Sequence, residues 1–268
     1  MIRSIFVDDC IESGINFSAG GARYNWSVIN FMGLSNPIDS LMNIKRFVFD
    51  DKAISGKELV EVFSQNFKGN EQLRQRLIKS PKFGNGDNET DKMAKELSSF
   101  IYNEIGLYAP YRGGRFLPSC IMFVTYDSFG KPIGATPDGR LSGTPIADNC
   151  GAMQGMDRKG PTALLNSALS LDQHHAAGTM VLNNRISKQV FDDAQGRIKL
   201  QKLISTYLSE GGEQLQINVI DGETLRKALE NPEEYSNLII RMGGYSEFFG
   251  RLSKELKLSV IDRIEHIL

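Results

Sequence analysis

The stretch that decides the fold is Arg241-Met242-Gly243-Gly244-Tyr245-Ser246-Glu247-Phe248-Phe249, close to the C-terminus of a 268-residue chain. A strand-like apolar run, residues 238–241, leads into it, and an amphipathic helix capped by Ser253 is predicted after it. A glycine pair between two such elements is most often an ordinary tight turn, because glycine takes positive φ without penalty. Glycine also offers a chemical property. Its Cα carries no side chain and lies between an amide nitrogen and a carbonyl, so it can lose a hydrogen atom to give a stabilised planar radical.

Composition narrows the class of protein. The formal net charge is −1 and 41% of residues are hydrophobic, which allows a buried core and gives no reason to expect a nucleic-acid partner. No apolar run is long enough to cross a bilayer, and the N-terminus lacks a signal-peptide pattern, so we expect no membrane partner. Cys10, Cys120 and Cys150 are widely spaced and predict neither a disulfide framework nor a metal site, which is typical of the reducing cytoplasm.

The predicted secondary structure changes near residue 107, from helices alone to strands and helices. Before it, helices are predicted from Asn36-Pro37, where Asn36 would cap, from a capping box at Ser55, over 71–79, and over about 93–106. After it, strands are predicted at 120–125, 215–220 and 238–241, with a helix over 191–208. The type of the short apolar segments 163–167 and 179–183 stays open. The alternation of strands and helices predicts an α/β fold with a mainly helical N-terminal portion.

The glycine stretch resembles the glycyl radical site of the pyruvate formate-lyase and diol dehydratase family, in which an Arg-Val-(Ala/Ser/Gly)-Gly-Tyr loop carries a stored radical. Matched residue by residue, the resemblance places the radical on Gly244, directly before Tyr245. Three positions depart from the strictest pattern. Met242 replaces a β-branched residue, Gly243 replaces the commoner Ala or Ser, and Glu247 replaces a small residue.

Further stretches look like landmarks of the same family in the same order. They are residues 8–12 (DDCIE), 20–25 (GGARYN), 83–85 (FGN), 134–140 (GATPDGR), 160–163 (GPTA), 216–219 (QINV), 231–235 (NPEEY) and 261–266 (IDRIEH). This ordered set is similar to the dehydratase and lyase branch of these anaerobic enzymes. It implies about one half-barrel of a ten-stranded pyruvate formate-lyase-like β/α barrel. Residues 1–140 would be the C-terminal part of the barrel domain and residues 141–268 the glycine radical domain.

The resemblance also identifies an absence. Family enzymes are much longer, and their radical glycine acts on a cysteine in a Gly-Cys-(Val/Ile)-Glu loop. Cys10-Ile11-Glu12 is not that loop, because Asp9 rather than glycine precedes the cysteine, and Cys10 is better read as an ordinary buried residue. The resemblance therefore implies the radical-bearing region or subunit of a lyase, dehydratase or formate acetyltransferase-like enzyme, storing a radical for a cysteine that this chain lacks.

The resemblance implies partners rather than bound cofactors. An activase that uses S-adenosylmethionine and an iron–sulfur cluster would install the radical. The Cys/Glu-bearing part would come from an N-terminal region or a separate large subunit, and a homo-oligomer stays open. Two alternatives also stay open: a non-catalytic accessory or replacement radical-domain protein, and an inactive remnant. The substrate cannot be read from these residues.

Other candidate residues have simpler interpretations beside the functional one. Arg263 fits a family arginine on the last helix that reaches back towards the radical loop, but could be a surface arginine. Adjacent histidines at 174–175 are a poor metal site, and residues 138–140 (DGR) favour a turn over a phosphate loop. Asn218 could line an active site or be a hydrogen-bonded core residue. Tyr245 is interpreted as packing around the loop.

Overall fold

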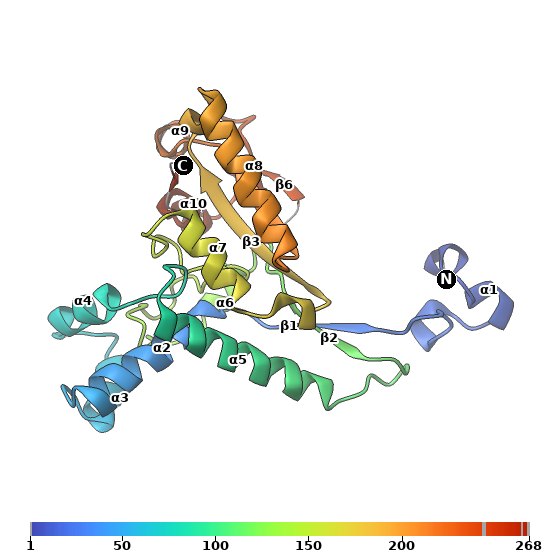
Figure 1. Cartoon of the computed structure of the whole chain (residues 1–268), viewed down its shortest axis with the longest axis horizontal. Coiled ribbons are helices and arrows are strands. Elements are labelled where there is room, and N and C mark those ends of the chain that lie inside the picture. Colours follow the sequence, from blue (N-terminus) through green and yellow to red (C-terminus); the bar gives the residue numbers. More distant parts are fainter. Residues whose placement is uncertain (1, 243–244, 264, 267–268) are drawn as a thin grey trace.

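The computed structural model of the protein describes residues 2–242, 245–263 and 265–266 (Figure 1). Gly243 and Gly244 therefore lie outside the described residues. A parallel sheet of five strands forms the centre, with β1 to β4 in sequence order and β7 paired with the end of β3. Its strands are β1 (Ser27–Asn30), β2 (Phe116–Cys120), β3 (Thr179–Ile186), β4 (Gln214–Asn218) and β7 (Glu265–His266). The predicted α/β class is confirmed.

Helical crossovers connect the parallel strands, as parallel pairing requires. The longest crossover, between β1 and β2, contains α2 (Ser35–Ile44), the π-helix η3 (Lys45–Asp50), α3 (Gly56–Ser64), α4 (Glu71–Lys79) and α5 (Asn88–Gly106). The later helices are α6 (Tyr126–Gly130), α7 (Pro161–Leu169), α8 (Ala194–Ser209), α9 (Gly222–Glu230) and α10 (Lys254–Asp262). Short 3₁₀ turns lie at η4 (Gln173–His175), η5 (Lys188–Phe191) and η6 (Phe249–Arg251). The segment 163–167, left open above, is helical, and 179–183 belongs to a strand.

Side-chain caps decide where several helices begin. Ser55 forms the predicted capping box with Glu58, and Ser253 accepts a hydrogen bond from the Leu256 amide at 3.2 Å. Asn36 does not cap α2, although the sequence suggested it. It lies inside the helix, where its Nδ2 donates to Asp138 at 2.6 Å and its Oδ1 accepts from the Ala147 amide at 2.7 Å. Asn36 therefore joins α2 to distant loops instead of starting the helix.

The strand predicted at 120–125 is wrong in position, since β2 ends at Cys120. Beyond it the backbone amides are taken by side chains rather than by a neighbouring strand: Ile121 donates to Asn30 at 3.1 Å and Met122 donates to Asn149 at 2.8 Å. Phe123 then adopts a positive φ of 49°, which no strand allows. Within this run Cys120 and Met122 are buried in the core, whereas Phe123 is 41% exposed, so its apolar character does not indicate pairing in the sheet.

Two of the hydrophobic clusters bear on the site. One lies between the sheet and helices α5, α7 and α8, and includes Tyr102, Leu165, Leu182 and Tyr207. The second lies under the C-terminal elements and joins hairpin residues to α9 and α10; its buried members include Ile240, Phe249, Leu225, Leu256 and Ile261. The C-terminal region is thus packed onto the rest of the chain by apolar burial.

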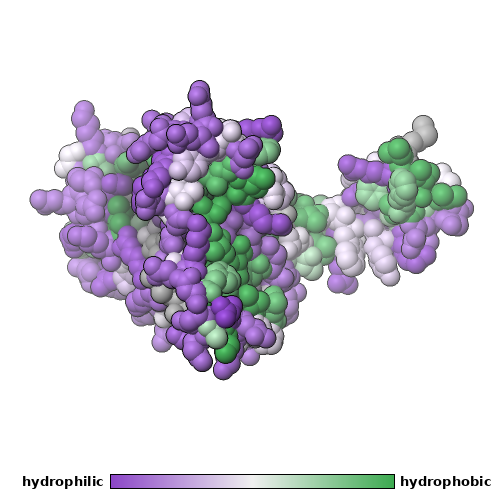
Figure 2. All heavy atoms as spheres, turned by 90° about the horizontal axis from the view of Figure 1, so that it is seen from above, coloured by the Kyte–Doolittle hydropathy of each residue, from purple (hydrophilic) through white to green (hydrophobic). Residues whose placement is uncertain are grey.

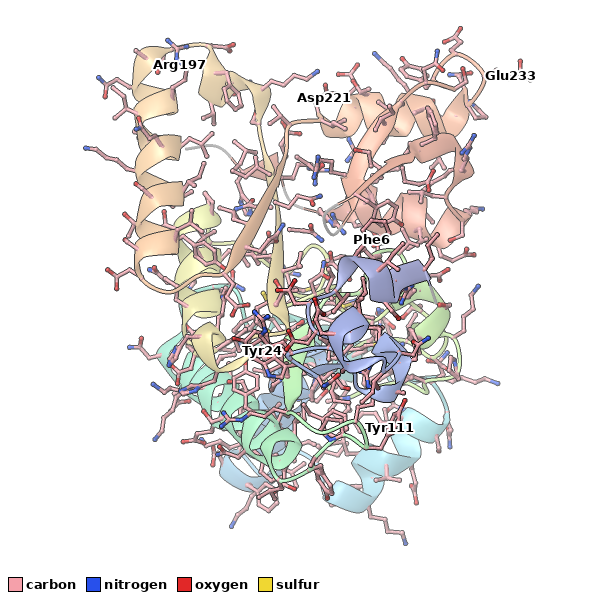
Figure 3. All side chains as sticks on the ribbon, turned by 90° about the vertical axis from the view of Figure 1, so that its right-hand side faces the viewer. Phe6, Tyr24, Tyr111, Arg197, Asp221 and Glu233 are labelled. Carbon is pink, nitrogen blue, oxygen red and sulfur yellow. The ribbon has the colours of Figure 1, made fainter. Side chains whose placement is uncertain are left out.

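An N-terminal segment projects away from this body. It contains η1 (Ile2–Phe6), α1 (Cys10–Ser13) and η2 (Phe17–Ala19), and extended chain connects it to β1 (Figure 1). Figure 2 shows hydrophobic residues gathered on the segment as well as on the main body. Phe6, Tyr24 and Tyr111 are labelled in Figure 3, where the segment faces the viewer, and their exposed fractions are 81%, 69% and 88%. Such exposed aromatic area is typical of a surface that another chain covers.

Asp39 on α2 makes a testable contribution to stability. Its carboxylate accepts the Phe83 amide at 2.7 Å. Burial raises the Asp39 pKa from 3.8 to about 7, with Lys82 opposing the shift and Asp138 adding to it. Between about pH 4 and pH 7 the folded protein keeps a proton that the unfolded chain has released, so stability should fall as pH rises across this window.

Asp39→Asn removes the titrating group and keeps an oxygen for Phe83. We expect the decline in unfolding free energy between pH 5 and pH 7.5, measured by urea denaturation, to be smaller in this variant than in the parent. An unchanged pH dependence would show that Asp39 titrates normally in the fold.

Candidate functional site

The glycine stretch is part of an antiparallel hairpin made of β5 (Ile239–Met242) and β6 (Tyr245–Phe248). The register pairs Ile239 with Phe248 and Met242 with Tyr245. The Phe249 amide also donates to the Leu238 carbonyl at 2.8 Å, which closes the open end of the hairpin. The two strands therefore run up to the glycine pair from both sides, and the predicted strand at 238–241 is found within one residue.

Asn218, the last residue of β4, attaches this hairpin to the parallel sheet. Its Nδ2 donates to the Arg241 carbonyl at 3.2 Å, and its Oδ1 accepts from the Arg241 amide at 3.3 Å. Of the two interpretations left open for Asn218, the hydrogen bonds expected of a core polar residue are found, although the residue is only partly buried; a role in lining an active site stays a prediction. The side chain is a connector between β4 and β5.

Tyr245 packs beside the hairpin, as the sequence suggested. Its ring meets the ring of Phe123 at a centroid distance of 5.4 Å and an interplanar angle of 62°, an edge-to-face contact. Burial, and secondarily the Glu247 carboxylate, raise the pKa of Tyr245. The phenol is therefore neutral at physiological pH.

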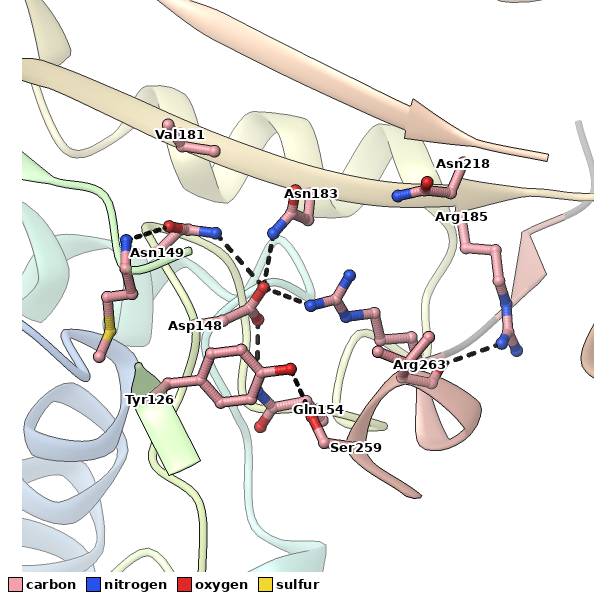
Figure 4. A network of polar contacts seen from close by, with 12 residues as sticks. Tyr126, Asp148, Asn149, Gln154, Val181, Asn183, Arg185, Asn218, Ser259 and Arg263 are labelled. Atoms are coloured by element: carbon pink, nitrogen blue, oxygen red, sulfur yellow. Dashed lines mark hydrogen bonds and ion pairs between the residues drawn. The ribbon is translucent and has the colours of Figure 1, made fainter. Parts of the chain in front are cut away.

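Arg263 has a largely buried side chain and is not a surface arginine. It follows α10, and its Nη2 lies 2.7 Å from Asp148 Oδ2, with exposed side-chain fractions of 11% and 7% (Figure 4). Asp148 also accepts Asn183 Nδ2 at 2.6 Å and Gln154 Nε2 at 3.3 Å. Burial lowers the Arg263 pKa, but Asp148, Tyr126 and Asp157 together more than offset it, so the pKa is raised overall. Asp148 is thus the centre of a polar network that sequence reasoning missed.

Three further contacts hold the C-terminal segment over the ends of the sheet strands. Arg185 from β3 donates through Nη1 to the carbonyls of Val260 and Ile261 at 3.2 and 3.3 Å, in the last turn of α10 (Figure 4). The nitrogen His266 Nε2 lies 2.7 Å from Asp157 Oδ2, and the Gly222 amide donates to Glu265 at 3.1 Å. Cations at a helix C-terminus are favourable, so Arg185 also complements the α10 dipole.

The cavity inside this network is too small for an organic substrate. Its volume is about 20 Å³, which is enough for one water molecule. The lining consists of Asp148, Gly151, Ala152, Gln154, Asp157, Leu164, Asn183, Arg185 and Arg263. Within this chain, the network therefore encloses room for a water molecule and not for an organic substrate.

The cysteines are placed as structural residues. Cys10, Cys120 and Cys150 are free and buried, as the sequence interpretation of Cys10 expected. Burial raises the pKa of the Cys120 thiol well above its usual value and does the same for Cys150, which also donates to the Val181 carbonyl at 3.0 Å. A protonated buried thiol is a poor nucleophile, so neither residue is activated by its surroundings.

The remaining candidate motifs are an exposed histidine pair and an arginine-containing turn. The His174 and His175 rings lie against each other at 4.0 Å, and no three-residue metal-binding group occurs among the described residues. Arg140 Nη1 donates to the Thr144 carbonyl at 2.7 Å and to the Leu141 carbonyl at 3.1 Å. Its guanidinium is thus occupied by carbonyls of the chain that flanks the 138–140 turn, which favours the turn interpretation over a phosphate loop. Within the described part of the chain, no helix is both long and apolar enough to cross a membrane.

Comparison with known proteins gives matches along most of the chain. Residues 1–130 match the family model described as pyruvate formate lyase-like, and residues 146–250 match the glycine radical model. Trans-4-hydroxy-L-proline dehydratase of Clostridioides difficile is 35% identical over 265 residues, which is 98% of this chain and 34% of that protein.

Solved structures agree with these matches. The glycerol-bound B12-independent glycerol dehydratase of Clostridium butyricum superposes with a TM-score of 0.94 at 38% identity, covering 99% of this chain and 34% of that one. A glycyl radical enzyme of Archaeoglobus fulgidus gives 0.93 at 34% identity, covering 100% of this chain and 34% of its own. The present chain thus spans about a third of the length of these relatives.

Proposed function

Because this chain belongs to the glycyl radical enzyme family, we propose that it stores a radical on Gly244 and passes it to a cysteine that another part of the enzyme supplies. The observation that carries the proposal is the hairpin. Its register places Met242 and Tyr245 on either side of the two glycines, inside the region that matches the glycine radical family. The three cysteines of this chain are buried, and none lies in a Gly-Cys-(Val/Ile)-Glu sequence, so the acceptor is proposed to come from another part of the enzyme.

Radical storage needs one hydrogen atom to leave the Gly244 Cα. In this family a radical S-adenosylmethionine activase generally removes it, and we propose the same class of partner here. This chain's own residues hold and shelter the site. Ile240 and Phe249 bury the base of the hairpin, and the Tyr245 and Phe123 rings pack beside it.

The sheet supports the proposal of an incomplete barrel. We propose that residues 1–140 contribute the C-terminal part of a barrel domain, that residues 141–268 form the glycine radical domain, and that together they supply about one half-barrel. Parallel sheets are normally covered on both faces and paired at their edges. Here β1 lies at one end of the strand order, and Val28 and Ile29 on it have exposed fractions of 53% and 37%.

The exposed aromatic residues Phe6, Tyr24 and Tyr111, on the N-terminal segment and in the chain beside it, form a second uncovered surface next to this unpaired edge. The partner that would cover both is the Cys/Glu-bearing part of the enzyme, as an N-terminal region or a separate large subunit. In the assembled enzyme the activity would be a dehydratase or related lyase reaction, since the similar proteins include dehydratases of a hydroxylated amino acid and of glycerol. An alternative is that this chain is a non-catalytic accessory protein that transfers its radical to a larger enzyme. That enzyme would then cover the same exposed surface.

The exposed surface predicts self-association of the chain when it is purified alone. Val28→Lys places a charge on the edge strand, which blocks further strand pairing. We expect the parent chain to form oligomers at micromolar concentration in sedimentation velocity experiments, and the variant to shift towards monomer. Val60→Lys is the matched control, because Val60 is similarly exposed at 65% but lies on helix α3 and not on the edge strand. A parent chain that stays monomeric, or an equal shift in both variants, would contradict the prediction.

A further inference from the structure

We infer that Asn218 is a positioning residue that clamps the glycine hairpin to the parallel sheet and thereby prolongs the life of a radical at its tip. The lifetime part of this inference rests on the function proposed above. The clamp itself does not, because it follows from two hydrogen bonds between described atoms.

The clamp joins two different kinds of sheet. Through its backbone, Asn218 is paired with Arg185 as the last residue of β4 in the parallel sheet. Through its side chain, it bonds to both backbone groups of Arg241 in the antiparallel hairpin. A carboxamide presents one donor and one acceptor side by side, as a peptide group of a neighbouring strand does. The Asn218 side chain thus substitutes for a strand pairing that the two sheets do not make directly.

The residue that the clamp holds lies close to the glycines in the chain. Arg241 precedes Gly244 by three residues and is paired with Ser246 across the hairpin. A two-stranded hairpin is marginally stable on its own and depends on packing and external contacts. Phe249 is buried at the base of the hairpin and Ile240 beside Arg241, the Tyr245 ring packs on Phe123, and Asn218 adds the hydrogen bonds to Arg241, one residue nearer the glycines than Ile240. Loosening the clamp should therefore let the glycine end open to solvent while the base stays packed.

The chemistry of the side chain predicts a graded series of variants. Asn218→Leu has a similar volume but neither donor nor acceptor, so both bonds are lost. Asn218→Asp keeps an acceptor for the Arg241 amide, but its carboxylate faces the Arg241 carbonyl without a proton to donate. Asn218→Gln keeps both groups on a chain longer by one methylene and should rescue part of the effect. The expected order of hairpin protection is Asn, then Gln, then Asp, then Leu.

Hydrogen–deuterium exchange on the unactivated full chain tests the clamp without any radical. We expect exchange of the Arg241 amide and its hairpin neighbours to be at least tenfold faster in Asn218→Leu than in the parent. Asp221→Asn is the matched control. Asp221 lies three residues further on, binds Lys188 at 2.7 Å and caps α9, and has no contact with the hairpin among the described residues. Parent-like exchange in Asn218→Leu would overturn the clamp. If Asn218→Leu does not fold, Asn218→Asp is used as the test variant in its place.

Electron paramagnetic resonance after anaerobic activation tests the consequence. With activation yields matched, the glycyl signal of Asn218→Leu should decay several-fold faster than that of the parent or of Asp221→Asn, and Asn218→Gln should restore part of the lifetime. Equal decay rates would overturn the effect on the radical while leaving the proposed function intact. If the parent itself gives no glycyl signal, the proposed function fails, and the exchange experiment alone decides the clamp.

Discussion

Gly244→Ala is expected to abolish the glycyl radical completely while leaving the protein folded. A Cβ at this position crowds the planar arrangement in which nitrogen donation and carbonyl withdrawal stabilise the unpaired electron. After anaerobic treatment with a radical S-adenosylmethionine activase, the parent should show the doublet of a glycyl radical in electron paramagnetic resonance, and the variant should show none. Circular dichroism should be the same for both proteins.

The neighbouring glycine provides the control. Family members commonly carry Ala or Ser where this chain has Gly243, so Gly243→Ala should keep the doublet. Exposure of the activated parent to oxygen should also cut the backbone between Gly243 and Tyr245 and release a small C-terminal fragment, visible by mass spectrometry. A doublet that persists in Gly244→Ala, or one that disappears only in Gly243→Ala, would place the radical elsewhere.

Arg263→Met is expected to destabilise the fold by about 3–5 kcal/mol, the usual range for removing one partner of a buried ion pair. Asp148 stays behind with an exposed fraction of 7% and keeps its hydrogen bonds to Asn183 and Gln154, but loses the cation. The cost is therefore mainly that of an uncompensated buried carboxylate. Urea denaturation gives the free energy difference directly.

A double-mutant cycle separates the ion pair from lost packing. Adding Asp148→Asn to Arg263→Met should recover part of the stability, because the buried charge is removed as well. Arg46→Met is the surface control. Arg46 pairs with Asp51 at 3.9 Å, both side chains are about half exposed, and exposed pairs contribute little. If Arg263→Met costs no more than Arg46→Met, the Asp148 network does not support the C-terminal segment.

Local chemistry explains which expectations from the sequence are confirmed. The capping serines Ser55 and Ser253 and the helix over 71–79 depend on residues within a few positions of one another, and each is found where predicted. The same holds for the strand predicted near 215, which is β4. Family membership is equally readable, because the ordered motifs are properties of the sequence and match known family models. The radical role of Gly244 and the position of the domain boundary stay predictions.

The sequence predictions that were wrong involve residues whose hydrogen-bond partners are distant in the chain. The run at 120–125 leaves the sheet because Asn30 and Asn149 take its amides. Asn36 forms hydrogen bonds with Asp138 and Ala147 instead of capping its own helix. No periodicity or spacing indicates such pairings, since a polar side chain shows its capacity for hydrogen bonds but not the partner.

The amino-acid sequence alone was therefore enough to predict the α/β class, several helix starts and the family. Helix caps depend on hydrogen bonds between residues close together in the chain, and family motifs are properties of the sequence itself. Folding in three dimensions decided what supports the glycine hairpin. Arg263 finds Asp148 from 115 residues away, and Asn218 reaches across 23 residues to Arg241. Buried charges and amides need partners wherever the packed core brings them, and only the packed core determines which residues those are.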